Sequence, residues 1–220
     1  MPTFSEENYL KTIYHLSKES VDKVSVKSIA DGLSNNPASV IDMLKKLTTK
    51  KMIQYDKIKG AKLTEKGLKT ALFVVRKHRL WEVFLKDKLG YNWDEIHEIA
   101  EQMEHIKDEG LVERLDKFLG SPEYDPHGDP IPKSNGQLPN SIKTLLSMVE
   151  VGETCKVAAV KDTSSIFLQY LQQLSVSIGT KIKVIDKITF DGSMKIQIGK
   201  DIETIVSIKF AESLLVDQII

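Results

Sequence analysis

Cysteine and long apolar runs are scarce in this sequence, which has one cysteine, Cys155, among its 220 residues. A single cysteine cannot form an internal disulfide, and such usage is typical of a reducing compartment. No segment approaches the roughly 18 consecutive apolar residues of a membrane-spanning helix. The first ten residues, MPTFSEENYL, also lack the apolar core of a signal peptide. We therefore expect a cytoplasmic protein that does not enter the membrane.

Net charge is also absent, because 31 Lys and Arg balance 31 Asp and Glu. The charge is unevenly spread, however. Residues 1–78 hold 15 basic against 8 acidic side chains, about +7, so the remainder carries about −7. A basic first third beside an acidic remainder favours contact of one end with a polyanion.

The first third of the chain has the pattern of a winged helix-turn-helix. Apolar spacing over 5–17 predicts a helix, with Ser5 as its N-cap. A short amphipathic helix follows, then the polar turn SNN and a longer helix that begins at Pro37. The next segment, IQYDKIKGAKLTEKG, predicts a β-hairpin around Gly60, which would be the wing.

The rest of the chain changes from helical to β character. A long helix is expected from Thr64 to Leu89, followed by helices near 93–106 and 109–119. Five of the seven prolines fall within 121–140, which indicates a domain boundary. Beyond it, short β-branched runs with one amphipathic helix predict a small SH3-like β-barrel.

The helix-turn-helix predicts a DNA-binding surface. A recognition helix enters the major groove by its N-terminal residues, which are here Asn36, Pro37, Ala38 and Ser39. Lysines of the same region are expected to meet phosphates, namely Lys27, Lys46, Lys50 and Lys59. The alternative is a winged helix used for protein contacts, but the basic excess favours DNA.

A second pattern concerns metal binding. In the segment ending IAEQMEHIKDE, a helical rotation of about 100° per residue brings His97, Glu101, Glu104 and His105 within one stripe about 100° wide. Taken alone, such a stripe is more often a solvated face than a ligand set. The long helix offers a second pair, His78 and Glu82, four residues apart. Two helices with His and Glu can converge on a divalent ion. Without sulfur donors, the set suits Mn(II) or Fe(II).

Taken together, these features resemble the DtxR/MntR family of metal-dependent transcriptional repressors, in the long form with a C-terminal FeoA-like SH3 domain. The segments that carry the resemblance are ENYLKTIY at 7–14, NNPASVIDMLKKL at 35–47, RKHRLWEVFL at 76–85, EQMEHIKDE at 101–109 and HGDPIP at 127–132. The resemblance implies a homodimer that represses transcription by binding operator DNA when loaded with metal, and that controls metal homeostasis. It implies no enzymatic activity.

The resemblance also implies two metal sites. The primary set maps to Asn8, Glu101, Glu104 and His105. Manganese-type members usually have Asp at the position of Asn8, and iron-type members have Met. Lys11 stands where binuclear manganese sensors have a second Glu.

The ancillary set is implied by the same resemblance. His78, Glu82 and His97 match it, and the SH3 positions that supply Glu and Gln in some members fall on Ile166 and Gln169. Streptococcal-type manganese regulators resemble a different set, which maps to Glu82, His127 and Asp162, with their cysteine at Asp125.

These implications define the expected organisation. We expect a mainly α N-terminal winged helix-turn-helix DNA-binding domain over 1–72, a helical metal-binding and dimerisation domain over 73–140, ending in a Pro-rich linker, and an SH3-like (FeoA-like) domain over 141–220. Mn(II) is favoured over Fe(II), because neither Cys nor Met is available at the matched positions. The alternatives are a winged-helix regulator that senses iron or a non-metal ligand, and an enzyme with a His/Glu metal centre.

Overall fold

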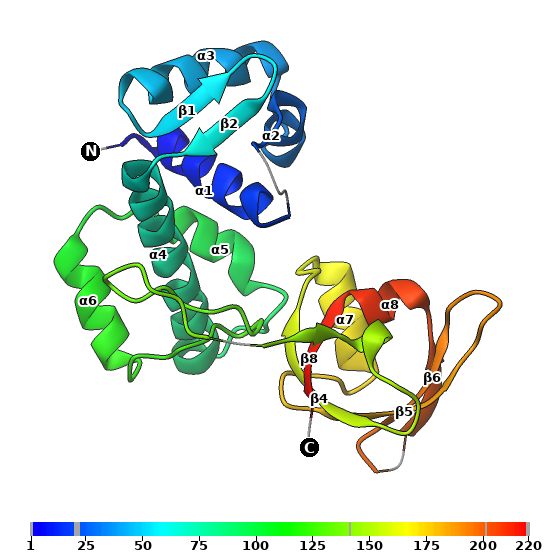
Figure 1. Cartoon of the computed structure of the whole chain (residues 1–220). Coiled ribbons are helices and arrows are strands. Elements are labelled where there is room, and N and C mark those ends of the chain that lie inside the picture. Colours follow the sequence, from blue (N-terminus) through cyan, green and yellow to red (C-terminus); the bar gives the residue numbers. More distant parts are fainter. Residues whose placement is uncertain (1, 20–22, 141, 201, 219–220) are drawn as a thin grey trace. The chain divides into compact units, whose positions relative to one another are not determined.

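The computed structural model describes residues 2–19, 23–140, 142–200 and 202–218 (Figure 1). No helix among these residues is both long enough and apolar enough to cross a membrane. The contacts divide the chain into two compact units, each described by itself. The first comprises Met1–His78, Glu101–Arg114 and Pro132–Leu138, and the second comprises Arg79–Ala100, Leu115–Ile131 and Pro139–Ile220.

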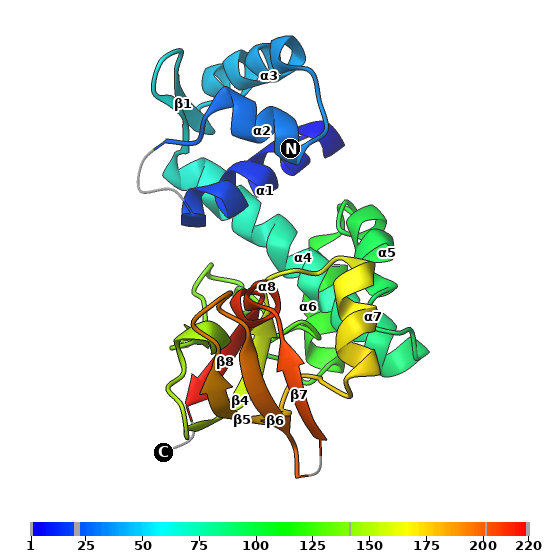
Figure 2. The same cartoon turned by 90° about the vertical axis from the view of Figure 1, so that its right-hand side faces the viewer.

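The first unit contains the expected helix-turn-helix and hairpin. Three helices and an antiparallel pair of strands enclose a core that includes Leu10, Ile29 and Leu44, each fully buried (Figures 1 and 2). The interpretation as a winged helix-turn-helix fold is confirmed. The elements are α1 (Phe4–Glu19), α2 (Val26–Gly32), α3 (Pro37–Thr49), β1 (Ile53–Asp56) and β2 (Gly60–Leu63).

The hairpin depends on glycine at position 60. Gly60 has φ +89°, and a Cβ there would lie 2.2 Å from the carbonyl oxygen of Val24. This close approach arises because Val24 pairs with Ala61, with N···O distances of 2.8 and 2.9 Å. Only a residue without a side chain fits both the left-handed backbone and the adjacent strand.

The N-terminus of α1 differs from the prediction. Ser5 lies inside the helix, so its assignment as N-cap was wrong. Thr3 takes that role: Glu6 donates its backbone N–H to Thr3 Oγ1 at 3.4 Å, and Thr3 N donates to Glu6 Oε2 at 3.0 Å. This reciprocal pair is a capping box, which satisfies two donors at once and starts the helix earlier.

The long helix α4 (Glu65–Leu89) matches the prediction, and Gly67 N donates to Thr64 Oγ1 at its start. The two helices after it, α5 (Ile96–Met103) and α6 (Glu109–Phe118), are shorter than expected. Because α5 ends at Met103, Glu104 and His105 lie in the following turn. The predicted single helical stripe is therefore wrong, since only His97 and Glu101 share the helix.

The second unit contains one six-stranded antiparallel sheet in the order β3-β8-β4-β5-β6-β7. Within the described residues, β3 and β7 are its edges and no pairing closes a barrel. Strands β4 to β7 form from the expected β-branched runs CKVAAV, KIKVIDKITF, MKIQIG and ETIVSI, whereas β3, β8, α8 and the 3-10 turn η1 were not predicted. The elements are β3 (Thr144–Leu145), η1 (Leu146–Met148), β4 (Thr154–Val160), α7 (Ser165–Gln173), β5 (Lys181–Lys187), β6 (Met194–Ile198), β7 (Ile202–Val206), α8 (Ile208–Glu212) and β8 (Leu214–Gln218).

Cys155 belongs to the core of this second unit. Its side chain is fully buried, and the thiol donates to the carbonyl oxygen of Ile182 at 3.4 Å. Burial raises the pKa of the Cys155 thiol to about 11, which disfavours the thiolate needed for metal binding or redox chemistry.

Candidate metal centre

Two clusters of potential ligands lie in the described residues, one in each unit. The first, called here the α1 cluster, gathers side chains from α1, α4, α5 and the turn after α5. Its members are Glu7, Lys11, His78, Glu101, Glu104 and His105.

A lysine lies at the centre of the α1 cluster. Lys11 Nζ donates to Glu101 Oε1 at 2.6 Å and to the two carboxylate oxygens of Glu104 at 2.7 and 2.8 Å. Lys11 is 9% exposed and Glu104 is fully buried. The ammonium thus offsets the charge of the fully buried Glu104 carboxylate, whose burial without a cation would cost much free energy.

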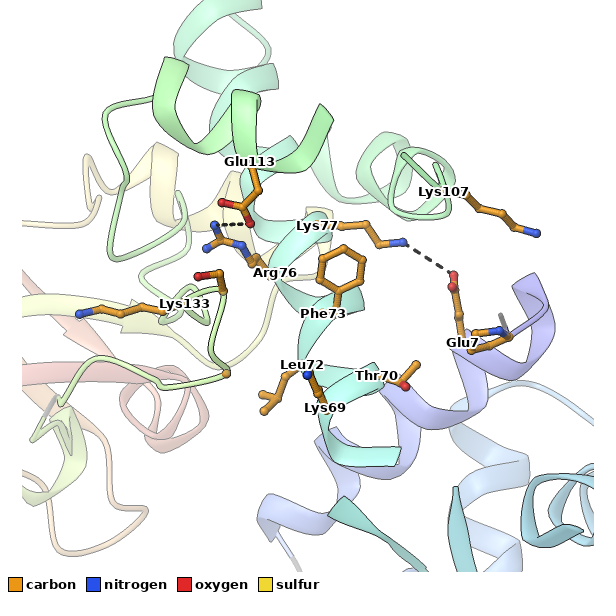
Figure 3. A pocket seen from close by; sticks show the side chains of 13 residues that line it. Glu7, Lys69, Thr70, Leu72, Phe73, Arg76, Lys77, Lys107, Glu113 and Lys133 are labelled. Carbon is orange, nitrogen blue, oxygen red and sulfur yellow. Dashed lines mark ion pairs between the residues drawn. The ribbon is translucent and has the colours of Figure 1, made fainter. Parts of the chain in front are cut away.

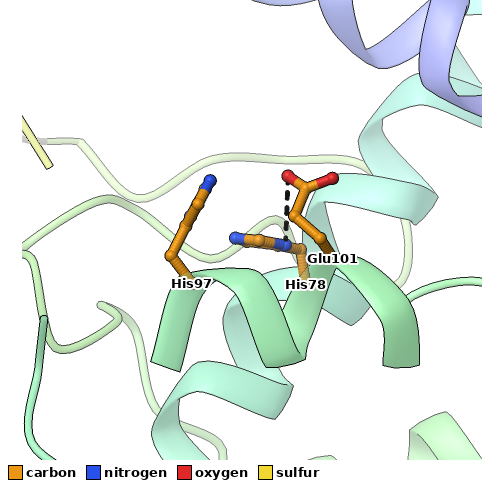
Figure 4. A group of neighbouring side chains, drawn as sticks. All are labelled: His78, His97 and Glu101. Carbon is orange, nitrogen blue, oxygen red and sulfur yellow. Dashed lines mark ion pairs between the residues drawn. The ribbon is translucent and has the colours of Figure 1, made fainter. Parts of the chain in front are cut away.

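His78 extends from α4 into the same group. Its Nδ1 lies 2.7 Å from Glu104 Oε2 and 3.9 Å from Glu101 Oε1, the latter pair being drawn in Figure 4. Burial opposes ionisation of Glu104, but His78 and Lys11 outweigh it and lower the pKa of this carboxyl. His97 lies one turn before Glu101 on α5 (Figure 4).

The remaining members of the predicted primary set are engaged differently. His105 Nδ1 lies 2.7 Å from Glu7 Oε2, and its Nε2 lies 3.4 Å from Glu104 Oε1. The Oδ1 atom of Asn8 is buried, with no hydrogen-bond partner in the described part of the chain. The structure therefore brings Glu101, Glu104 and His105 together, but around a lysine ammonium. The donors do not fit a divalent ion while Lys11 remains there.

A pocket of about 460 Å³ adjoins this cluster (Figure 3). Glu7, which holds His105, also lines the pocket, and its Oε2 lies 3.9 Å from Lys77 Nζ. Burial lowers the pKa of Lys77, although Glu7 and Glu104 counteract this effect. Glu7 is thus shared between the α1 cluster and the pocket wall.

The second cluster, called here the buried carboxylate cluster, consists of Glu82, Asp125 and His127. Each offers a ligand atom, and these atoms lie within 4.8 Å of one another. All three residues are buried, and His127 Nδ1 lies 3.6 Å from Glu82 Oε1. His97 also approaches, with Nδ1 3.3 Å from the same Glu82 oxygen.

Neighbouring groups orient the buried carboxylate cluster. His127 Nε2 lies 2.8 Å from the carbonyl oxygen of Trp93, which can only accept, so Nε2 carries a proton. In the neutral ring Nδ1 then presents a lone pair toward Glu82, as a metal ligand requires. Asp125 Oδ1 accepts from the backbone N–H groups of His127 and Asp129, each at 2.9 Å.

The electrostatics of this second cluster favour a cation. Burial, together with the nearby carboxylates of Glu82 and Asp129, raises the pKa of Asp125 to about 7, although Arg79 opposes the shift. Burial disfavours protonated His127, but Glu82 and Asp125 outweigh it and raise the pKa of the imidazole. A divalent ion would displace these protons, so its affinity is expected to rise with pH through about 7. Two carboxylates and an imidazole fit a Mn(II) or Fe(II) ion.

The loop that carries His127 requires glycine at position 128. Gly128 has φ +84°, and a Cβ there would lie 2.0 Å from the carbonyl oxygen of Ala158 on β4. The adjacent carbonyl of His127 accepts from Val160 N at 3.0 Å. The loop is thereby held against the strand.

We expect Gly128→Ala to displace this loop, because the new methyl group overlaps the backbone of β4. Stability should fall by more than about 1 kcal/mol, and Mn(II) affinity should fall with it, measured by thermal melting and calorimetry. Gly120→Ala is the matched control, since Gly120 has φ +79° but nothing within 4 Å of a Cβ. Equal losses in both variants would mean that backbone strain alone, not the contact with β4, explains the effect.

The remaining predicted ancillary ligands have other hydrogen-bond partners. Asp162 Oδ1 accepts from Ser164 N at 2.9 Å, just before α7. Gln169 Nε2 donates to Asp94 Oδ2 at 2.9 Å, and Ile166 is 83% exposed. His78 Nδ1 lies 2.7 Å from Glu104 Oε2. Their role as ancillary ligands stays a prediction.

Two residues of the clusters were not predicted as functional groups from sequence patterns. Asp125 was named only by its matched position in the resemblance, and Lys11 was not expected at the centre of the α1 cluster.

The predicted DNA-binding residues fall into two groups. Asn36, Pro37, Ala38 and Ser39 are exposed at the N-terminus of α3, where Asn36 Oδ1 caps the helix by accepting from Ala38 N at 2.7 Å. Lys27 and Lys59 are exposed as well. These residues are available to a duplex.

Lys46 and Lys50 are held by a buried carboxylate. Lys46 Nζ lies 3.0 Å and Lys50 Nζ 2.7 Å from Glu6 Oε1, and Glu6 is fully buried. Burial opposes ionisation of Glu6, but hydrogen bonds from Lys50, the Thr3 amide and Lys46 outweigh it and lower the pKa to about 2. Phosphate contact by these two lysines stays a prediction, and Glu6 competes with it.

Comparison with known proteins identifies families for almost the whole chain. Residues 1–61 match the family described as iron dependent repressor, N-terminal DNA binding domain. Residues 64–133 match iron dependent repressor, metal binding and dimerisation domain, and residues 144–218 match the FeoA domain.

Individual proteins show the same relationship. A manganese-dependent transcriptional repressor in complex with manganese is 32% identical, with 97% of this chain and 100% of that chain covered and a TM-score of 0.89. ScaR with bound Zn²⁺ is 33% identical, with 99% and 100% covered and a TM-score of 0.81. The iron-dependent repressor IdeR of Mycobacterium bovis is 36% identical over 126 residues, which cover 57% of this chain and 54% of that protein.

The match to IdeR thus spans about half the length of that curated relative. The match to the manganese-dependent repressor covers 97% of this chain, and it extends through both units. IdeR and the manganese-dependent repressor are both regulators of transcription, a class without enzymatic activity. The chain therefore belongs to the DtxR/MntR family of metal-dependent transcriptional repressors.

Proposed function

We propose that this protein is a cytoplasmic, homodimeric repressor that binds operator DNA when a divalent ion occupies the buried carboxylate cluster, and so controls metal homeostasis. The observation that carries the proposal is the convergence of Glu82, Asp125 and His127, buried and within 4.8 Å of one another. Asp125 Oδ2 lies 3.3 Å from Arg79 Nε, so the guanidinium offsets one of the two buried carboxylates, and a divalent ion would offset the charge of the other.

Each part of the chain has its own role in this function. Residues 1–72 bind DNA, 73–140 bind metal and form the dimer, and 141–220 form the FeoA-like domain. His97 is within reach of the ion through its position 3.3 Å from Glu82. Asn8, Glu101, Glu104 and His105 remain a second proposed metal set, which a divalent ion can use only if Lys11 leaves.

Mn(II) is the proposed activator, with Fe(II) as the second choice. The cluster offers carboxylate oxygens and imidazole nitrogen and no sulfur, which suits hard and borderline divalent ions. Relatives whose names contain manganese, zinc and iron support metal activation. The preference for Mn(II) rests on the donor set of this chain.

Activation follows from linkage between the two binding events. An ion that binds the DNA-competent state more tightly shifts the population toward it, and operator DNA must raise the affinity for the ion by the same factor. The long helix α4 carries Glu82 and contributes residues to both units, so it is the element through which the two events can be coupled.

The test is a metal titration of DNA binding. A duplex is first selected from a random pool in the presence of Mn(II), and binding is then followed by fluorescence anisotropy with Mn(II), Fe(II), Zn(II) or a chelator. We expect tight binding with Mn(II) and release by the chelator. Binding that persists in the chelator would reject metal activation and favour a regulator that senses a non-metal ligand.

The wing lysine gives a separate prediction about the DNA surface. Lys59 is exposed at the hairpin, so Lys59→Ala should remove one phosphate contact. The slope of log K against log salt should decrease by about one unit, with equal weakening on all sequences. Lys200→Ala, an exposed lysine of the second unit, serves as the control. An unchanged slope for Lys59→Ala would place the wing outside the DNA interface.

A further inference from the structure

The α1 cluster already contains a cation that belongs to the chain. An ammonium group has three N–H donors, and Lys11 has three carboxylate oxygens at 2.6, 2.7 and 2.8 Å. Its hydrogen-bonding capacity is therefore saturated by Glu101 and Glu104. Charge-assisted bonds of this length are the strong ones among protein hydrogen bonds.

The geometry leaves little room for a second cation at this point. Both oxygens of Glu104 are bound to Lys11, and Oε2 is also 2.7 Å from His78 Nδ1. A divalent ion that bound Glu101 and Glu104 would lie beside the ammonium, where like charges repel strongly in a buried site. The ion can enter only if the ammonium leaves.

The backbone around Lys11 keeps its side chain directed to the cluster. Leu10 and Ile13 of α1 are fully buried in the core of the first unit, so the helix cannot rotate freely. The side chain of Lys11 itself is 11% exposed. Lys11 thus connects α1 to Glu101 on α5 and to Glu104 in the turn beyond it.

We propose that Lys11 is the resident cation of the α1 cluster: it links α1 to α5 and the following turn without metal, and it excludes a divalent ion from Glu101, Glu104 and His105. Only the buried carboxylate cluster then responds to metal, so the chain binds one regulatory ion. This inference rests on the proposed function for the identity of that ion.

The test measures Mn(II) stoichiometry in the full-length protein by equilibrium dialysis and metal analysis. Lys11→Glu replaces the ammonium by a further carboxylate, whereas Lys18→Gln removes an exposed lysine of the same helix as the matched control. We expect about one Mn(II) per chain for the wild type and for Lys18→Gln, and about two for Lys11→Glu. Glu82→Gln alone should bind about zero Mn(II) per chain, and the double variant with Lys11→Glu should bind about one.

The outcomes separate this inference from the proposed function. If Glu82→Gln still binds one ion, the regulatory ion has been assigned to the wrong cluster. The effect of Lys11→Glu on Mn(II) stoichiometry can still be measured, both in the wild-type protein and in Glu82→Gln. If the wild type binds two ions and Glu104→Gln removes one of them, Lys11 does not exclude metal and the inference is overturned. Equal stoichiometry for folded Lys11→Glu and the wild type would also overturn it.

Thermal melting of Lys11→Gln gives a second measurement if Lys11→Glu does not fold. Without added metal, its melting temperature should fall below that of the wild type, because Glu101 and Glu104 lose their cation. Excess Mn(II) should restore most of the loss, since an ion that binds only the folded state stabilises it. A melting temperature equal to that of Lys18→Gln, with or without Mn(II), would contradict the role of resident cation.

Discussion

Glu82→Gln is expected to abolish Mn(II)-activated operator binding while leaving the protein folded. The substitution keeps the size of the side chain but removes the charge that faces His97 and His127. Loss of a ligand should lower Mn(II) affinity by about 100-fold or more, since even outer contacts of metal sites are worth 10–100-fold. Calorimetry gives the metal affinity, and anisotropy gives operator binding in the same samples.

Asp87→Asn is the matched control for this prediction. Asp87 is an exposed carboxylate on the same helix, α4, so its removal changes the charge by the same amount away from the cluster. Mn(II) affinity and operator binding of Asp87→Asn should equal those of the wild type. Retention of both properties by Glu82→Gln would show that the buried carboxylate cluster is not the regulatory metal site.

Glu6→Gln is expected to destabilise the winged-helix part of the chain by on the order of 2 to 3 kcal/mol at pH 7. The folded state lowers the pKa of Glu6 from 4.5 to about 2, and each pKa unit corresponds to about 1.36 kcal/mol. The loss is smaller than the full pKa shift implies, because Lys46 and Lys50 are half-exposed and solvent screens their charges. Urea unfolding at pH 7 measures the loss.

The pH dependence of this contribution has a definite sign. A carboxyl with a lowered pKa in the folded state stabilises the protein fully above its unfolded value, near 4.5. The contribution should decrease as the pH falls from about 4.5 to about 2, so the difference between wild type and Glu6→Gln should vanish in acid. Glu65→Gln, an exposed glutamate of the same unit, should show almost no difference at any pH. A pH-independent loss in Glu6→Gln would assign the effect to packing and not to charge.

Glu6→Gln should also change DNA binding, because Lys46 and Lys50 lose their competing partner. Non-specific affinity should increase, and the dependence on salt should become steeper by one to two phosphate contacts. An increase of two contacts would establish that both lysines face the duplex when they are released, and an increase of one would assign the contact to one of them.

Local signals in the sequence predicted much of the first unit. Asn36 and Pro37 begin α3 as expected, and Thr64 caps α4, because capping depends on residues within one turn. The end of α5 was not predicted because no Gly or Pro directly follows Met103. The next two residues, Glu104 and His105, contact Lys11 and Glu7 of α1, and local sequence does not encode such contacts. The short elements β3 and α8 carry too few residues for a periodic pattern.

The two side-chain clusters could also be predicted only in part from the sequence. The resemblance indicated Glu82, His97 and His127, and the structure brings their side chains together. The role of Lys11 could not be predicted from spacing, because its partners Glu101 and Glu104 lie 90 and 93 residues away along the chain. Helical periodicity specifies which side chains share a face, but not which charged side chain of another helix meets that face.

Helix α1 makes two ion-pair contacts that serve different functions. Glu6 pairs with the lysines at the C-terminal end of α3, in the predicted DNA-binding part, and Lys11 pairs with Glu101 and Glu104 of the α1 cluster. Glu6 and Lys11 are five positions apart, with four residues between them, which amounts to about 500° of rotation and a rise of about 7.5 Å. Insertion or deletion of one residue there would turn one contact away by about 100° while the other is kept. Homologous chains that retain both contacts can therefore vary in side chains along α1 but not in the number of residues between them, which makes this spacing a stricter evolutionary constraint than the identity of the intervening exposed positions.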